Sequence, residues 1–160
     1  MSTDISSSAR AHKENWLPIL ELAVEEVFEI MLGCRLTPVT PSEHAVHGEF
    51  TAMVGLAGSL CGVLTVRCDA ETARQIAKSM LGDTADAEQQ VADALGEICN
   101  MIAGNFKNKL AGTDERCLLS VPTVISGGEY KFRSMVDGEV VDTVLLFEGA
   151  PVAVCLQLQG

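Results

Sequence analysis

The sequence lacks any long run of apolar residues. Residues 1–15 are polar and rich in serine, with no apolar stretch that could act as the core of a secretory signal. Elsewhere no segment approaches the roughly 20 apolar residues that a transmembrane helix needs. We therefore expect a cytoplasmic protein without a membrane partner.

Positive charge is also scarce. The chain has 11 Lys and Arg against 22 Asp and Glu, which gives a formal net charge of −11 and a pI near 4.6. Nucleic acids and anionic lipids carry the same sign and would be repelled. The expected partner is a protein or a small molecule, and no nucleic acid.

Patterns typical of metal, disulfide and nucleotide sites are missing as well. The six cysteines form no C-x-x-C pair, and several lie in apolar runs, as reduced core cysteines do. His44 and His47 are close in sequence, but no third metal ligand is arranged around them. There is no G-x-x-x-x-G-K-[ST] loop. We expect no metal and no cofactor on this chain.

Apolar residues, by contrast, are plentiful. They make up 48% of the 160 residues, with a mean hydropathy of +0.24, which is ample for the core of one domain. We predict that residues 1–15 form a flexible N-terminal extension and that residues 16–160 form a single domain.

Periodicity predicts three helices and several short strands. Apolar residues at three- and four-residue steps predict helices over Trp16–Leu32, with Pro18 in the opening turn, over Ala70–Leu81, capped by Asp69, and over about Ala87–Ala111. The predicted strands are Phe50–Leu56, Leu60–Cys68, Cys117–Ile125, Tyr130–Val136, Val140–Phe147 and Val152–Leu158, and Asp137-Gly138 is the strongest hairpin signal. This arrangement indicates an α+β fold with a mainly antiparallel sheet covered by long helices.

The chain also contains a weak internal repeat. Residues 23–33 (AVEEVFEIMLG) and 94–104 (ALGEICNMIAG) share Ala, a Glu three positions later, apolar residues and a final Gly. Each helix is later followed by a hairpin, which would suit a pseudo-twofold domain. Asn100 of the second copy is matched by Glu29 in the first.

The third predicted helix carries the candidate site. Successive residues about 100° apart place Val91, Leu95, Ile98 and Ile102 on one face, and Asp93, Glu97, Asn100 and Gly104 on the opposite one. Charged and amide residues on an exposed face are usually only solvated. Gly104, however, lowers helix stability by roughly 1 kcal/mol relative to Ala, and one explanation is a gap for a partner surface.

Residues 93–105, DALGEICNMIAGN, closely resemble the E-x-x-N signature helix of the CheX, CheC and FliY chemotaxis phosphatases, with Glu97 and Asn100 as E and N. Residues 26–31 (EVFEIM) and 120–127 (SVPTVISG) resemble flanking segments of the same family. Since Glu29 stands where a second site would need Asn, the chain is similar to the single-site, CheX-like members.

The resemblance implies a phosphatase that hydrolyses the aspartyl phosphate of a CheY-like response regulator in two-component signalling. Asn100 would position the attacking water, as a Gln does in GTPases. Glu97 would dock to a lysine of the receiver domain. The receiver would supply its own Mg²⁺, and the protein would form a homodimer through sheet edges, as relatives do.

Two other interpretations stay open from the sequence. The same fold could be a non-catalytic receiver-binding or adaptor module, although the presence of both Glu97 and Asn100 speaks against it. It could also be a structural or apolar-ligand domain, in which these two residues could be changed without effect on a partner's chemistry.

Overall fold

The computed structural model describes residues 4–40, 46, 48–58, 60–85, 87–110, 117–128 and 138–159, with the backbone alone for residues 4–15. The helices in these ranges are α1 (Asp4–Leu32), α2 (Ala70–Leu81) and α3 (Glu88–Lys109). The strands are β1 (Thr37–Val39), β2 (Phe50–Gly58), β3 (Gly62–Cys68), β4 (Cys117–Leu119), β5 (Thr123–Ser126), β6 (Gly138–Phe147) and β7 (Ala150–Gln159).

The strands form one sheet in the order β1-β6-β7-β3-β2-β4, with β5 also paired to β2. Every described pair is antiparallel. The predicted α+β class with a mainly antiparallel sheet is therefore confirmed. Antiparallel pairing follows from the short turns that join β2 to β3 and β6 to β7.

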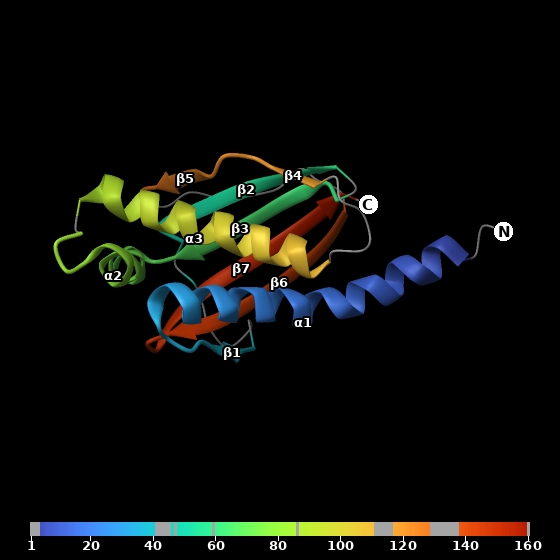
Figure 1. Ribbon diagram of the computed structural model, residues 1–160, viewed down its shortest axis with the longest axis horizontal. Helices are drawn as coiled ribbons and strands as arrows, with labels where there is room; N and C mark the ends of the chain where they lie inside the picture. Colours follow the sequence, from blue (N-terminus) through green and yellow to red (C-terminus); the bar gives the residue numbers. More distant parts are fainter. Residues whose placement is uncertain are drawn as a thin grey trace.

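The helices lie against one face of this sheet, with α1 and α3 crossing in front of the strands (Figure 1). Strand residues that alternate toward the helices are fully buried, among them Leu64 and Val66 of β3 and Val154 and Leu156 of β7. Phe28 of α1 packs against Phe147 of β6 with ring centroids 5.7 Å apart. The helix–sheet interface is thus the hydrophobic core.

The predicted internal repeat appears in the topology. β3 and β7 lie side by side at the centre of the sheet, each paired with the other strand of its own hairpin, β2 or β6. β1, which follows α1, pairs with β6 of the second half. β4 and β5, which follow α3, pair with β2 of the first half. The two halves exchange their edge strands, so that α1 and α3 lie in corresponding places.

The first helix begins earlier than predicted and ends, as predicted, at Leu32. It begins at Asp4 rather than near Trp16, so Pro18 lies inside the helix and not in its opening turn. A proline there lacks the N–H that would bond the carbonyl four residues earlier. Near the other end Ile30 is 78% exposed although its spacing placed it on the apolar stripe, because the buried face follows Leu20, Val24, Val27 and Phe28.

The strands differ from the prediction in two places. Thr37–Val39 forms a strand that was not predicted; Pro38 is tolerated because β1 is an edge strand, where a missing N–H costs no ladder bond. The predicted strand Cys117–Ile125 is broken into β4 and β5. The predicted strand Tyr130–Val136 and Asp137 lie outside the described residues.

Candidate functional site

Helix α3 presents the predicted site on a rigid support. At the start of the helix, Gln90 Oε1 accepts the Ala87 N–H at 3.3 Å, which satisfies a backbone donor that has no partner within the helix. One face is buried against the sheet and the other helices, and includes all four predicted core positions, Val91, Leu95, Ile98 and Ile102. Because this face is held along the whole helix, the opposite face has a fixed orientation.

Glu97 and Asn100 lie on that opposite face, about one helical turn apart. Glu97 is exposed and Asn100 is half-buried. Neither side chain has a hydrogen bond or an ion pair to any residue that the structure describes. No described residue therefore prevents these polar groups from acting on a molecule that approaches α3.

The segment between β4 and β5 forms one side of this site. Between β5 and β4 the pairing with β2 shifts by one residue, because Met53 opposes Thr123 while Leu56 opposes Leu119. At the resulting bulge Ser120 Oγ accepts the Gly55 N–H at 2.8 Å. The bulge brings the segment between the two strands against α3.

Gly96 allows that close approach. A Cβ atom at position 96 would lie 3.4 Å from Pro122 Cβ and 3.3 Å from Val124 Cγ2. These spacings are tighter than ordinary van der Waals contact, so a larger residue would push the bulge away from α3. Gly96 therefore fixes the wall beside Glu97, a role that periodicity alone did not reveal.

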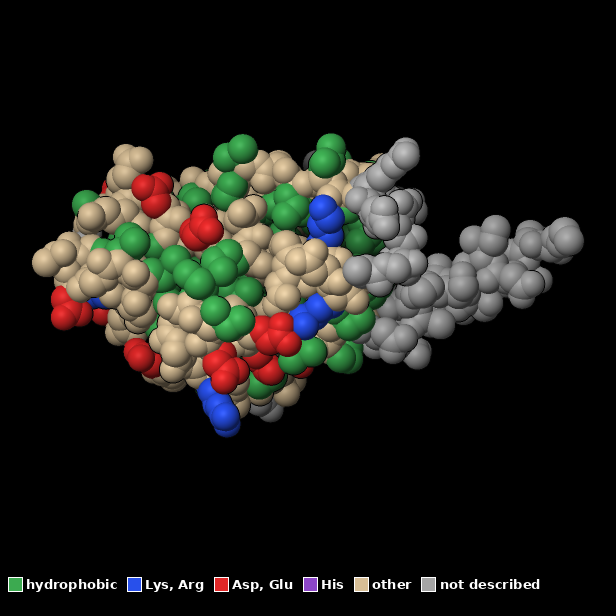
Figure 2. All heavy atoms as spheres, in the orientation of Figure 1, with side chains coloured by type: hydrophobic (Ala, Val, Ile, Leu, Met, Phe, Trp, Pro, Cys, Tyr) green, Lys and Arg blue, Asp and Glu red, His purple; other side chains and the backbone are tan. Residues whose placement is uncertain are grey.

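On the side of α3 that faces α1, Asn100 lines a groove between the two helices with a volume of about 410 Å³. The groove residues are Glu26, Val27, Ile30, Asn100, Met101, Gly104, Asn105, Asn108 and Leu119. Gly104 contributes to the open space, because the nearest atom to a Cβ built there is Leu119 Cδ1 at 4.0 Å. Acidic side chains gather over this part of α1, with Lys or Arg side chains beside them (Figure 2).

A polar bridge joins α1 to α3 along the same groove. Asn105 Nδ2 donates to the Ala23 carbonyl at 3.2 Å and to Glu26 Oε2 at 3.0 Å. Lys109 Nζ lies 2.8 Å from the same Glu26 oxygen. The hydrogen bonds from Lys109 and Asn105 lower the pKa of Glu26, so this carboxylate stays ionised.

Cys99, next to Asn100 in sequence, is not part of the exposed site. Its side chain is fully buried and its Sγ lies 3.7 Å from the Leu64 carbonyl oxygen. Burial raises the pKa of this thiol to about 12. A buried thiol with a raised pKa is a packed core group rather than a nucleophile.

Metal binding has no support in the described ranges. There, no three His, Cys, Asp or Glu side chains converge on a position that could hold a metal ion. His44 and His47 lie outside the described residues. The expectation that they bind no metal therefore stays a prediction, as does the expected absence of a cofactor. Among the described helices none is long and apolar enough to cross a membrane.

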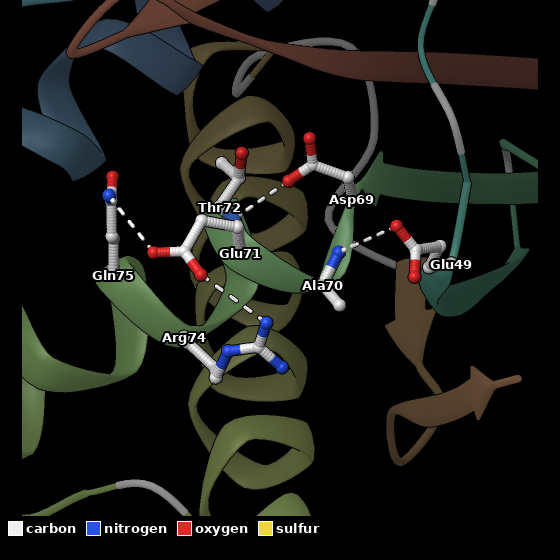
Figure 3. Close-up of polar contacts among 7 residues, drawn as sticks. All are labelled: Glu49, Asp69, Ala70, Glu71, Thr72, Arg74 and Gln75. Carbon is white, nitrogen blue, oxygen red and sulfur yellow. Dashed lines mark hydrogen bonds and ion pairs between the residues drawn. The ribbon is translucent and has the colours of Figure 1, made fainter.

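A second cleft of about 270 Å³ lies near the start of α2 and is lined by Glu49, Phe50, Arg74, Glu88, Val91, Ser126 and Gly127. Its polar groups already have partners. Figure 3 shows Glu49 accepting from the Ala70 N–H, Asp69 capping Thr72, and Glu71 paired with Arg74. Ser126 Oγ donates to Glu88 at 2.8 Å. The polar residues of this cleft therefore act as helix caps and surface pairs.

Residues 50–144, more than half of the chain, match the family model for the chemotaxis phosphatase CheX. The chain belongs to the CheX family. The matched range includes α3 with Glu97 and Asn100, and it confirms the resemblance inferred from the E-x-x-N helix.

Individual relatives agree with this assignment. The CheY-P phosphatase CheX of Thermotoga maritima is 28% identical over 99 residues, which span 61% of this chain and 64% of that protein, less than two thirds of its length. The CheX–CheY–BeF3–Mg²⁺ complex from Borrelia burgdorferi contains a similar chain, with a TM-score of 0.77, 25% identity, and coverage of 91% of this chain and 98% of that one. CheX from Desulfovibrio desulfuricans gives a TM-score of 0.79 at 24% identity, covering 91% and 99%.

Sequence reasoning located the E-x-x-N pair but missed the residues around it. Nothing in the apolar spacing distinguished the exposed Ile30 from its buried neighbours. The bridge of Glu26, Asn105 and Lys109 joins residues about 80 positions apart, and a single sequence holds no signal of such a long-range contact. Gly96, Pro122 and Val124 all lay within segments that resemble the family, yet nothing in the sequence indicated that they contact one another.

Proposed function

We propose that this protein is a phosphatase that hydrolyses the aspartyl phosphate of a CheY-like response regulator. The observation that carries the proposal is the Glu97–Asn100 pair on the exposed face of α3, without partners among the described residues, in a chain of the CheX family. A relative named CheY-P phosphatase and a CheX chain in complex with CheY support the choice of substrate.

Asn100 acts as the residue that positions water. A carboxamide does not titrate in the physiological range, so it cannot serve as a general base. Its carbonyl accepts one hydrogen bond from a water and its NH₂ group can donate to a phosphoryl oxygen. The water oxygen attacks phosphorus, the bond from phosphorus to the aspartyl oxygen breaks, and the water's proton ends on inorganic phosphate or solvent.

Glu97 acts as the docking residue. Its exposed carboxylate can form a charge-assisted hydrogen bond with a lysine near the receiver's phosphorylated aspartate. That contact holds α3 in the orientation from which Asn100 reaches the phosphoryl group, since proximity and orientation dominate such reactions. The Mg²⁺ of the reaction belongs to the receiver, and this chain contributes no metal.

The protein acts as a homodimer in this proposal. The sheet offers two edges, β1 and the β4–β5 side, through which a second copy could pair. Light scattering at several protein concentrations measures the assembly directly. A mass of twice 17.0 kDa supports the dimer, and a monomer mass at every concentration contradicts it.

The function is tested by mixing the purified protein with receiver domains phosphorylated by acetyl phosphate and following phosphate release. We expect wild type to accelerate release from at least one receiver, and Glu97→Ala to weaken binding to that receiver by about tenfold, or about 1.4 kcal/mol. Gln89→Ala changes another exposed residue of α3 and serves as the matched control. Binding of a receiver without accelerated release would favour the non-catalytic adaptor instead.

A further inference from the structure

The bridge between α1 and α3 uses both hydrogen atoms of one amide group. Asn105 Nδ2 contacts the Ala23 carbonyl at 3.2 Å and Glu26 Oε2 at 3.0 Å. A carboxamide nitrogen has two N–H donors, and both are used here. The opposite orientation of the amide would bring its oxygen against these two acceptors. Asn105 therefore has one favourable orientation, tied to the backbone and to a side chain of α1.

Lys109 strengthens the same contact from the next turn of α3. Its Nζ is 2.8 Å from Glu26 Oε2, the oxygen that Asn105 also contacts. The side chains of Lys109 and Glu26 are 22% and 37% exposed, so water screens the pair. An ion pair of this kind adds little to global stability. Its main effect is on geometry, because it fixes where Glu26 lies.

This bridge lies in the groove that holds Asn100. Glu26, Asn100 and Asn105 all line it, and Asn105 follows Asn100 by just over one helical turn. Apolar residues such as Val27 and Met101 also line the groove. Apolar packing is non-directional, so it allows small sliding movements that a pair of hydrogen bonds opposes.

The bridge also controls charge in the groove. Glu26 lines the same groove as Asn100, and without its partners this carboxylate would repel an anionic phosphoryl group that Asn100 receives in the proposed reaction. Like charges that meet without compensation cost binding energy. Lys109 neutralises this carboxylate, and Asn105 holds it against α1.

We propose that Asn105, with Glu26 and Lys109, forms a positioning unit that fixes α3 against α1 and so holds Asn100 in its reactive orientation. The inference rests on the proposed phosphatase function. Asn105 does not touch the reacting atoms; it acts through Asn100. A displacement of about 1 Å at a catalytic group can lower a rate by about 100-fold, so loss of the bridge should affect the chemical step more than docking.

The test separates chemistry from binding. The rate of phosphate release is measured with the receiver saturated by excess phosphatase, and the dissociation constant is measured with a BeF3-activated receiver, which is not hydrolysed. We expect Asn105→Ala to lower the saturated rate by about tenfold or more and to change the dissociation constant by less than about threefold. Lys109→Arg keeps a donor toward Glu26 and should retain most of the rate. Lys107→Ala removes a neighbouring lysine with no described partner and is the matched control.

A second readout needs no activity. The side-chain NH₂ signals of Asn100, assigned by their loss in Asn100→Ala, should shift or broaden in Asn105→Ala but not in Lys107→Ala. Unchanged Asn100 signals, or a wild-type saturated rate in a folded Asn105→Ala, overturn the positioning role. If wild type accelerates no receiver, the phosphatase function fails, and the Asn100 signals still decide whether the bridge orients that residue.

Discussion

At the scale of single residues, the candidate site consists of the carboxylate of Glu97 and the amide of Asn100, which lack partners among the described residues. Nearby polar groups are hydrogen-bonded, as in the Asn105–Glu26 bridge and at the Ser120 bulge. Glu97 and Asn100, by contrast, have no partner among the described residues. Polar groups at such positions are easily solvated, so exposure alone does not prove a role. The combination of exposure, a groove beside Asn100 and membership of the CheX family makes the functional interpretation specific.

Gly104 gives a prediction at this scale. Gly104→Ala should raise the stability of α3 by roughly 1 kcal/mol, because alanine is the better helix former, and the nearest atom to the new Cβ is 4.0 Å away. The methyl group would nevertheless enter the groove and should weaken receiver binding. Thermal unfolding and a binding titration measure the two effects. A stabilised variant with unchanged binding would show that the groove does not receive the partner.

At the scale of elements, α1 and α3 are related by the repeat but are not equivalent in chemistry. Glu26 corresponds to Glu97, and Glu29 to Asn100. Glu97 has no partner in the part of the chain that the structure describes, whereas Glu26 is held by Asn105 and Lys109. The first helix therefore differs from a working site in two respects: it lacks the amide, and its glutamate is already engaged.

A graft experiment follows from this difference. In the Asn100→Ala background, Glu29→Asn recreates an E-x-x-N pattern on α1 with Glu26 as its glutamate. We expect no recovery of phosphate release, because Glu26 is not available to dock a receiver. Recovery to within about tenfold of wild type would contradict this account, since it would show that sequence pattern alone makes a site.

The bridge also predicts a dependence of stability on pH. The pKa of Glu26 is lowered in the folded state from an ordinary value of 4.5. The contribution of the bridge is therefore present above that ordinary value and is lost as pH falls through the lowered one. Urea unfolding should show wild type slightly more stable than Glu26→Gln near pH 7, with a difference that shrinks as the pH falls below 4.5. An equal difference at all of these pH values would mean that the charge of Glu26 is irrelevant.

At the scale of the whole molecule, much of the fold could be predicted from the sequence, because local signals were strong. Asp69 and Gly82 set the ends of α2, and the prediction of Ala70–Leu81 is confirmed residue for residue. The hairpin β2–β3 followed from two β-prone runs and a Gly-containing turn. Where a long-range contact decides the structure, prediction was weaker: the break between β4 and β5 depends on Ser120 and Gly55, which are 65 residues apart.

The candidate site shows the same contrast between local features, which could be predicted, and long-range contacts, which could not. The placement of Glu97 and Asn100 on the outer face of α3 could be predicted because both belong to one helix, while their role stays a proposal. The groove could not be predicted, because it arises where two helices from the two halves of the repeat meet over the sheet. Ile30 and Leu119 come to the same groove as Asn100 from distant parts of the chain. A helical period says which side of each helix is buried, but not which helices are neighbours.

The most direct test of the central claim compares wild type with Asn100→Ala on one phosphorylated receiver, measuring phosphate release at saturating phosphatase. The account predicts that Asn100→Ala binds the receiver as wild type does but releases phosphate at least about 100-fold more slowly, as expected when a group that stabilises the transition state is lost. Full activity in Asn100→Ala would contradict the account, because hydrolysis would then not depend on the amide of α3.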